Sequence, residues 1–462
     1  MLTRNAQRDT RFSFWPRVRE FAVPPSMIES ATARRHVGDW AGACAAAHVD
    51  VDLSLPSVAG AHGRELTARI RADLRHLAPD LLRWHLPRVA PDGLLRPGLT
   101  IPLARYDTVG PDGVRPVHLV VRTPPAWADA GQRISLALWD GTRADPGARR
   151  HPHPHPSRRF RLDLHRHLWD ARRTDELPTR AGADRPPGDE PVAGPRRCAV
   201  YRWAAEAEIL LRAEGRPAGP VAVRLGARSR LTIEAATGRG PDTDGPGPPG
   251  LRIAPAPPDG GAALPVLPDA ATWVLPDLEL LRAGAVTPGR LHPLVASALA
   301  PGAAPAGPPP VTGRAGRARL VECRGAQHRI GLVDGVLTAL DHDPAEIRRE
   351  ELLVALTGTP LPCLRAIDEA HRRPDCLTGV RERLDHGDIT GALAVVEELL
   401  GPEALLREGA LKDELETAAR RRITYGLYRA GLTGPGPGSG PVRTNRPSHS
   451  GHRSRPRHST FR

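Results

Sequence analysis

The sequence predicts a multidomain α+β protein, with helical regions toward both ends and an antiparallel β-rich domain between them. Three observations lead to this fold class. Apolar residues recur with a helical period of about 3.6 before residue 92 and again after residue 343. Between residues 96 and 236 the period is about two, which is typical of half-buried strands. The 46 glycines and 51 prolines gather in a few stretches, and these mark loops between modules.

The N-terminal part divides into an extension that we predict to be disordered, 1–26, and a helical module, 27–92. The extension carries charges throughout and no apolar stretch, so it is not expected to be a signal peptide. Asp39 precedes an alanine-rich run and is expected to cap a helix. Apolar residues at helical spacing continue from Leu66 to Leu82.

The central part, 96–236, is predicted to form short strands arranged as a sandwich or in a barrel-like fold. Strand candidates of about five to ten residues alternate there with turn-rich loops. They include 159–167 and 198–211, of which the longer segment is also compatible with a helix.

The remaining chain alternates linkers with small modules. An Asp-Gly turn between two apolar runs predicts a β-meander. A capping-box pattern that begins at Asp343 predicts the start of a helical domain. The predicted segments are 237–262 (Pro/Gly linker), 263–299 (small module to which we assign no secondary structure), 300–316 (linker), 317–342 (β-meander), 343–432 (helical domain) and 433–462 (disordered basic tail).

One short pattern occurs twice. Gly38–Ala45 and Gly387–Ala394 share the sequence Gly-Asp-x-x-Gly-Ala-x-Ala, which resembles the turn and second-helix start of tetratricopeptide-like helical hairpins. A solenoid requires about three adjacent repeats. We therefore interpret the two copies as capped, alanine-rich helices.

Positive charge comes almost entirely from arginine, because Lys412 is the only lysine. A phosphate loop needs a lysine directly after a glycine, so no such loop can form. The Asp-Glu-Ala-His segment at 368–371 is therefore expected on a helix surface rather than in a nucleotide hydrolase. The net charge of +13 is concentrated near the chain ends and in 149–173.

Two groups of side chains are candidates for a metal site. In the first, one histidine and two aspartates alternate along an extended segment, which places them on one face. In the second, three histidines alternate with prolines, and a polyproline II conformation would turn them about 120° apart. A polar face of a short extended segment is the favoured interpretation of the first group, and diverging histidines without a metal site are favoured for the second. The candidate ligands are His48, Asp50, Asp52, His151, His153 and His155.

The cysteines predict reduced thiols of a cytoplasmic protein, because their number is odd and no Cys-x-x-Cys pair occurs. Three of them lie in apolar stretches and are expected to be buried core thiols. Cys363 and His371 are eight residues apart on one predicted helix, too far for a nucleophile and its base. The five positions are Cys44, Cys198, Cys323, Cys363 and Cys376.

Arginines of 149–173 and of the C-terminal tail are candidates for contact with a nucleic acid or an acidic protein. Guanidinium groups bind phosphates and carboxylates as forks. Aromatic residues are sparse among them, and no nucleic-acid-reading motif accompanies them. The candidates are Arg158, Arg159, Arg161, Arg166, Arg453, Arg455 and Arg457.

Several segments resemble uncharacterised proteins of high-G+C actinobacteria of the Streptomyces type. Examples are HLAPDLLRWHLPR, RFRLDLHRHLWDARR and RIGLVDGVLTALDHDPAEIRREELLVALTGTPLPCL, and the resemblance covers most of residues 30–432. It carries no fold, reaction or site residue. It implies an association with systems that combine a MoxR-type ATPase with von Willebrand A adhesion domains.

These observations together predict a non-catalytic, cytoplasmic protein-interaction or scaffold protein. None of the catalytic motifs that we sought is complete, and the layout is modular. We expect protein partners, no cofactor and no membrane span. A metal-dependent hydrolase and a nucleic-acid-binding protein are the alternatives.

Overall fold

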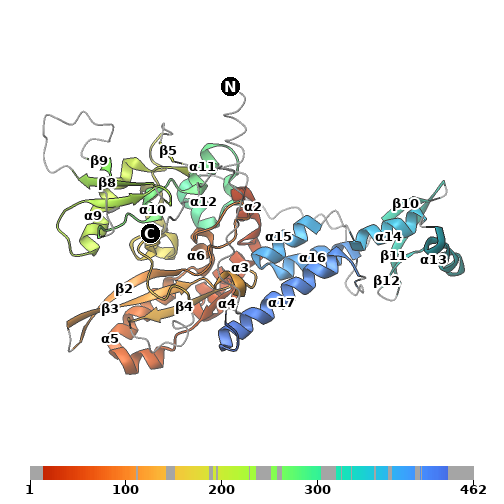
Figure 1. Cartoon of the computed structure of the whole chain (residues 1–462), viewed down its shortest axis with the longest axis horizontal. Coiled ribbons are helices and arrows are strands. Elements are labelled where there is room, and N and C mark those ends of the chain that lie inside the picture. The colour runs from red at the N-terminus through yellow and green to blue at the C-terminus, as the bar shows by residue number, and fades with distance from the viewer. Residues whose placement is uncertain are drawn as a thin grey trace, which may run out of the picture.

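The computed structural model is a mixed α+β protein that contains several small sheets (Figure 1). Within the part of the chain that it describes, no sheet closes into a barrel, and no helix is long and apolar enough to cross a bilayer. The described residues are 14–110, 113–141, 151–186, 191–193, 196–227, 229–235, 251–256, 263–302, 319–323, 325–333, 336–357, 361–372, 377–400, 406 and 408–434.

The N-terminal body is a four-stranded sheet packed against helices, in the strand order β1-β4-β3-β2. Its three longer strands are antiparallel, whereas β1 pairs in parallel with β4. Apolar side chains of the sheet, such as Ile101 and Leu103, are fully buried beneath the helices. The elements are α2 (Phe14–Phe21), α3 (Pro25–His36), α4 (Trp40–Ala46), β1 (Val49–Val51), α5 (Leu55–His76), α6 (Pro79–His85), β2 (Thr100–Gly110), β3 (Gly113–Arg122), η1 (Ala126–Ala128) and β4 (Ile134–Trp139).

A second body follows, with its own sheet, β7-β8-β9, and its own core around Trp203 and Ile233. Its last helices, α11 and α12, instead join the core of the N-terminal body. Asp277 of α11 accepts hydrogen bonds from Arg19 and Trp84, which fixes this junction. The elements are η2 (Leu162–Leu164), η3 (Arg166–Leu168), η4 (Ala171–Glu176), α8 (Leu177–Ala181), β5 (Val192–Ala193), β6 (Arg196–Arg197), η5 (Val200–Arg202), α9 (Trp203–Ala213), β7 (Val221–Arg224), β8 (Arg230–Ala235), β9 (Leu251–Pro255), α10 (Asp269–Thr272), α11 (Pro276–Arg282), η6 (Pro288–Arg290) and α12 (Pro293–Leu299).

The predicted sandwich or barrel over 96–236 is wrong, because these residues contribute to two separate larger sheets. The strand expected at 159–167 consists of 3₁₀ turns, and most of 198–211 is the helix α9. Alternating polar residues suggested a strand at 159–167, but Arg161 and Asp163 alternate because they form an ion pair with each other. His165 of this segment is buried beside Glu206 rather than exposed on the face of a strand.

Two segments that we predicted to lack structure contain regular elements. Helix α2 lies within 1–26, where Val18 is buried in the N-terminal core. Strand β9 lies within 237–262 and completes the second sheet by pairing with β8. In both cases tertiary packing outweighs a composition typical of disorder. The other residues of these two segments lie largely outside the described part.

The C-terminal part confirms the predicted β-meander and helices. The meander has the order β10-β11-β12, with antiparallel pairing throughout. The 368–371 segment lies on α14, as expected for a helix. Lys412 of α17 pairs with Glu408, just before the helix, and with Glu416, one turn further along it. The elements are β10 (Arg319–Cys323), β11 (Ala326–Val333), β12 (Val336–Ala339), α13 (Pro344–Thr357), α14 (Pro362–Arg372), α15 (Leu377–His386), α16 (Ile389–Leu400) and α17 (Ala410–Ala430).

The repeated sequence pattern forms two matching helical hairpins, α3–α4 and α15–α16. In each, the aspartate Oδ1 accepts from the amide of the glycine three residues later, at 2.8 Å in one hairpin and 2.9 Å in the other. In each, an arginine five residues earlier donates to Oδ2 of that aspartate. The first glycine has a φ of +80° or +89°, a conformation that glycine adopts without strain. A Cβ on the second glycine would overlap the capping carboxylate, so both glycines of the pattern have a steric cause.

The second hairpin packs against the N-terminal body. Arg83 is fully buried and donates to the carbonyl oxygen of His386 at 2.9 Å, and it also donates to the carbonyls of Ala22 and Gln132. The two hairpins border a cavity of about 680 Å³, which Arg34, Gly42, Leu384 and Asp388 help to line. Figure 1 shows α15–α17 beside α3 and α4, with the meander farther out.

Candidate metal centre

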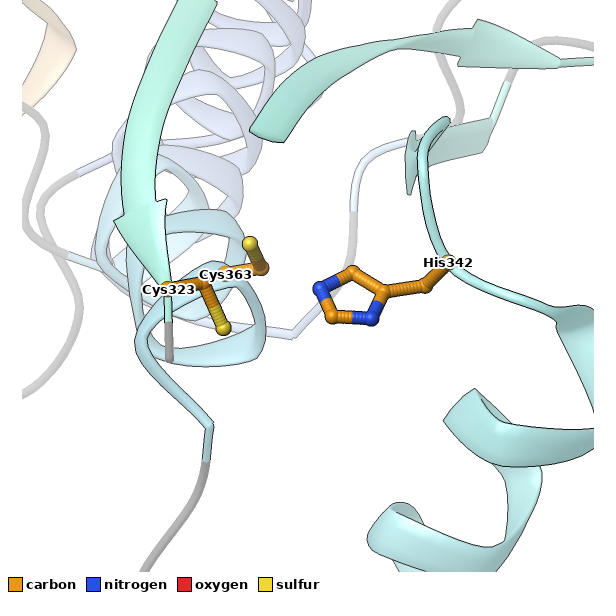
Figure 2. A group of neighbouring side chains, drawn as sticks. All are labelled: Cys323, His342 and Cys363. Atoms are coloured by element: carbon orange, nitrogen blue, oxygen red, sulfur yellow. The ribbon is translucent and has the colours of Figure 1, made fainter. Parts of the chain in front are cut away.

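Three side chains with metal-binding atoms meet where the meander packs on α14. Cys323 ends β10, Cys363 lies in the first turn of α14, and His342 lies in the turn between β12 and α13. Their ligand atoms all lie within 4.8 Å of one another. Figure 2 shows the imidazole ring with one edge turned toward the two sulfur atoms.

These ligand atoms are enclosed. Both cysteines are fully buried, and the side chain of His342 is only 4 % exposed. The Nε2 atom of His342 is buried and has no hydrogen-bond partner among the described residues. A buried nitrogen without a partner is costly, and a metal ion would supply the missing interaction.

The other ring nitrogen of His342 has a carboxylate beside it. Glu346 Oε2 lies 3.6 Å from Nδ1. Metal-bound histidines usually offer their second nitrogen to such a carboxylate, which orients the ring and makes it a stronger ligand. His328 of β11 stacks on the same imidazole, with ring centroids 4.2 Å apart, and holds its plane.

Local sequence explains why the three residues meet. Gly325, with a φ of +79°, follows Cys323 closely and allows the chain to turn back into β11. Arg329 of β11 binds Asp341 through its backbone amide and its guanidinium, which clamps the residue before His342 against the meander. Pro362 begins α14 and places Cys363 in the first turn of that helix.

Without a metal, the thiol of Cys363 is expected in the protonated form. Burial raises the pKa of Cys363 to about 11, and the adjacent Cys323 adds to the rise. A bound metal reverses this preference, because thiolates rather than thiols are ligands, so binding releases protons.

The donor set fits zinc best. Two sulfur ligands and one imidazole favour zinc over the hard cations, which prefer oxygen. Tetrahedral zinc with bonds of about 2.0–2.3 Å places its ligand atoms roughly 3.3–3.8 Å apart. Side-chain rotations that move the ligand atoms of Cys323, His342 and Cys363 by about 1 Å would bring them to that spacing. His328 is the candidate for the fourth ligand, because its Nδ1 is also buried without a hydrogen-bond partner among the described residues.

The first sequence candidates, on and beside β1, are brought together but already have partners. Asp50 accepts hydrogen bonds from Arg133 and Tyr425, and Asp52 pairs with Arg429. Burial would raise the pKa of Asp50, but those hydrogen bonds bring it below its usual value. Burial and nearby arginines lower the pKa of His48 to about 3. These partners fix helix α17 to the N-terminal body rather than leaving ligand atoms free.

The histidine tract is not gathered around one point. The two ring nitrogens of His151 each lie 2.9 Å from a backbone carbonyl oxygen, one of Thr123 and one of His153. The ring of His155 contacts Trp139 edge-on, with centroids 5.8 Å apart. Within the described residues, three such ligand atoms meet only at Cys323, His342 and Cys363.

Of the four arginine candidates that the structure describes, three are engaged in ion pairs. Arg159 binds Asp269, and Arg161 binds Asp163 and Glu214. Arg166 pairs with Asp73 and Asp170. Arg158 is exposed, whereas Arg453, Arg455 and Arg457 lie outside the described residues. The described part of the patch, 151–173, is therefore mostly an intramolecular ion-pair network.

Sequence reasoning missed the cysteine–histidine cluster. Cys323 was expected to be a buried thiol, and it is buried, but beside Cys363 rather than alone. The ligands are separated by 18 and 20 residues, so no short motif joins them. The usable signal was the position of each residue. Cys323 ends a strand of the meander, His342 lies just before α13, and Cys363 lies in the first turn of α14. Cys376 lies outside the described residues.

Comparison of the chain with protein-family models, with curated proteins and with solved structures found no match. The cluster must therefore be interpreted from its own chemistry.

Proposed function

We propose that this chain is a zinc-stabilised, non-catalytic protein-interaction protein. The observation that carries the proposal is the buried group of Cys323, His342 and Cys363, with the unpartnered Nε2 of the histidine directed at two thiols. Burial of all three ligands leaves little access for a substrate, which favours a structural metal over a catalytic one.

The size of the surrounding core supports a structural role. The meander–helix module, residues 319–372, comprises β10–β12, α13 and α14. Among the described residues its buried cluster has five members, and two of these are the cysteine ligands. So small an apolar core supplies little stability, and modules of this size usually need a metal or disulfides.

The surface of the same module supports an interaction role. Large apolar side chains are exposed on β10, at the ends of β11 and β12, and on α13, where Leu352 is 65 % exposed. Exposed apolar side chains concentrated on one small module are typical of a contact surface for another protein. They are Leu320, Val333, Leu340 and Leu352. A cytoplasmic location is part of the proposal, since a reducing compartment keeps both thiols available for zinc.

The metal is tested by analysis of the untagged protein purified without chelator. We expect one zinc per chain, lost in Cys323→Ser and Cys363→Ser and kept in Cys198→Ser, a buried cysteine of the second body. Cobalt substitution should give a thiolate-to-metal charge-transfer band that both ligand variants lose. Wild-type protein without metal, or with a Cys323–Cys363 disulfide, would overturn the metal site.

The interaction is tested by affinity capture from the native host with three forms of the protein. Wild type should retain a stoichiometric protein partner, Cys363→Ser should lose it, and Leu352→Glu should lose it while keeping its zinc. Equal capture by all three forms would refute a role of the module in binding. Retention of DNA instead of protein, abolished by removing 433–462, would favour the nucleic-acid alternative.

A further inference from the structure

A large cavity lies where the two folded bodies meet, remote from the metal-binding cluster. Its volume is about 820 Å³, within the range of small-molecule sites. Helices α2 and α6, with the loop after α6, form one side. Residues 159–162 and 269–276 of the second body form the other.

Aromatic rings make up much of the cavity lining. Trp84 and Trp273 are 2 % and 4 % exposed, and Phe160 is also buried. Trp15 and Phe14 of α2 contact each other with ring centroids 4.8 Å apart. Such a lining favours a flat apolar body over a strongly hydrated one.

The same cavity carries an excess of positive charge. Six arginines line it, but Asp269 is the one carboxylate among its described lining residues. Asp269 is shared, since Arg159 binds it through two hydrogen bonds and Arg196 lies 3.4 Å away. The charges of Arg19 and Arg161 are matched by Asp277, and by Asp163 and Glu214, outside the lining.

Two lining arginines, Arg88 and Arg96, form no direct ion pair with an acidic side chain among the described residues, although Asp269 attracts Arg96 from farther away. Arg88 donates only to the backbone carbonyls of Arg83 and Gly93, and its Nε atom is buried without a partner. The Nε atom of Arg96 is also buried and unpartnered. Both side chains are only partly exposed, so water compensates their charge incompletely. An oxyanion is the group that would satisfy them, because guanidinium groups bind carboxylates and phosphates through paired hydrogen bonds.

We propose that this cavity binds a small aromatic anion, with its ring system between the aromatic side chains and its carboxylate or phosphate at the arginines. Arg96 binds the anionic group directly, and Arg88 adds positive charge to the cavity wall. Arg196, whose guanidinium lies 4.7 Å from the centre of the Trp273 ring, supports the aromatic wall and adds charge. Asp269 positions Arg159 and excludes a second anion. The site is independent of zinc and of the meander–helix module.

The test uses anilinonaphthalene sulfonate, an aromatic anion, and phenylnaphthylamine, its uncharged counterpart, with the full-length protein. Calorimetry and fluorescence should show one saturable site per chain for the anion. Arg96→Leu should weaken anion binding about tenfold or more, because it removes a charge-assisted contact. The same change should alter binding of the uncharged probe less than about twofold. Arg420→Leu, on the exposed surface of α17, is the matched control for loss of an arginine.

The position of the binding site is tested by Leu225→Trp, which places a larger side chain in the cavity lining and should weaken binding of both probes. Rising ionic strength should weaken binding of the anion and leave binding of the uncharged probe unchanged. This measurement uses the wild-type protein, so it remains valid if Arg96→Leu fails to fold. Equal binding of the anion by wild type and Arg96→Leu would overturn the proposal. Binding that does not saturate, or that Leu225→Trp leaves unchanged, would overturn it too.

Discussion

The two helical hairpins share one sequence pattern and one set of hydrogen bonds but differ in their surroundings. In α3–α4, the residue before the positive-φ glycine is Val37, which is 81 % exposed. In α15–α16, the equivalent residue is His386, which is 1 % exposed. The local pattern therefore determines the turn, whereas the neighbours determine whether the turn is buried.

The contact that buries the second turn is between two glycines. A Cβ on Gly387 would lie 2.0 Å from the carbonyl oxygen of Gly131, but a Cβ on Gly38 would meet nothing within 4 Å. Arg83 and Arg17 add polar contacts to the second hairpin, through the His386 carbonyl and Glu382. One copy of the pattern is thus a free turn and the other is a docking point.

The largest expected effect comes from alanine at the two turn glycines. Gly38→Ala should cost about 1–2 kcal/mol, the cost of a left-handed conformation for a residue with a Cβ. Gly387→Ala should cost about 2–5 kcal/mol, because overpacking against Gly131 adds to the same backbone term. Urea unfolding of both variants measures the difference. Equal costs would show that the second turn is not docked.

The next effect concerns pH and His386. Burial, with Arg88, Arg83 and Arg17 nearby, lowers the pKa of His386 to about 3, from 6.5 for an unperturbed histidine. Between these values the unfolded chain binds more protons than the folded protein, so this contribution is complete above pH 6.5 and is lost as the pH falls toward 3. The slope should reach at most about 1.4 kcal/mol per pH unit.

His386→Asn should flatten that dependence in unfolding measurements across the acid range. His36→Asn, at the exposed end of α3, is the control and should leave the slope as it is. If the slope of the unfolding free energy against pH stayed unchanged in both variants, the burial of His386 at the docking contact would not cause the pH dependence.

A smaller effect is expected at the capping aspartates. Asp388→Ala should cost about 1–2 kcal/mol, since it removes the helix cap and leaves Arg383 without its partner. Asp39→Ala removes the same contacts at a more exposed position and should cost less. Thermal unfolding would rank the losses of stability in the two variants. A larger loss in Asp39→Ala would contradict the expected effect of burial.

The smallest effect is expected where α17 supports the second hairpin. Tyr425→Phe removes the hydrogen bond to Asp50 and should cost about 1 kcal/mol. Hydrogen exchange should rise in α15–α17 and stay constant in α3–α4. Arg420→Ala, which breaks an exposed ion pair on the same helix, should leave both regions unchanged.

Short-range signals in this sequence predicted structure well. The Gly-Asp pattern predicted both capped helices, and the Asp-Gly turn and capping box predicted the meander and α13. These features depend on residues within a few positions of one another. The sequence alone could predict them because backbone strain, capping and turn geometry are local.

Features that depend on distant residues were not predictable in the same way. The segment 159–167 alternated like a strand, yet its arginines and aspartate pair within 3₁₀ turns and across to Glu214. The β1 carboxylates looked available, but Arg133, Tyr425 and Arg429 occupy them, and two of those residues lie about 375 positions away. Cys323, His342 and Cys363 meet only after the meander has packed on α14.

The lone lysine gives the molecule a built-in labelling position. Lys412 carries the only side-chain amine, and it lies on α17, the helix whose Tyr425 reaches the N-terminal body. Hydrogen bonding to Glu408 raises the pKa of this amine, so its reaction needs a more alkaline pH than that of an ordinary lysine. Among side chains, an amine-reactive dye would therefore mark this helix alone. Its fluorescence could report undocking of the second hairpin without any engineered cysteine.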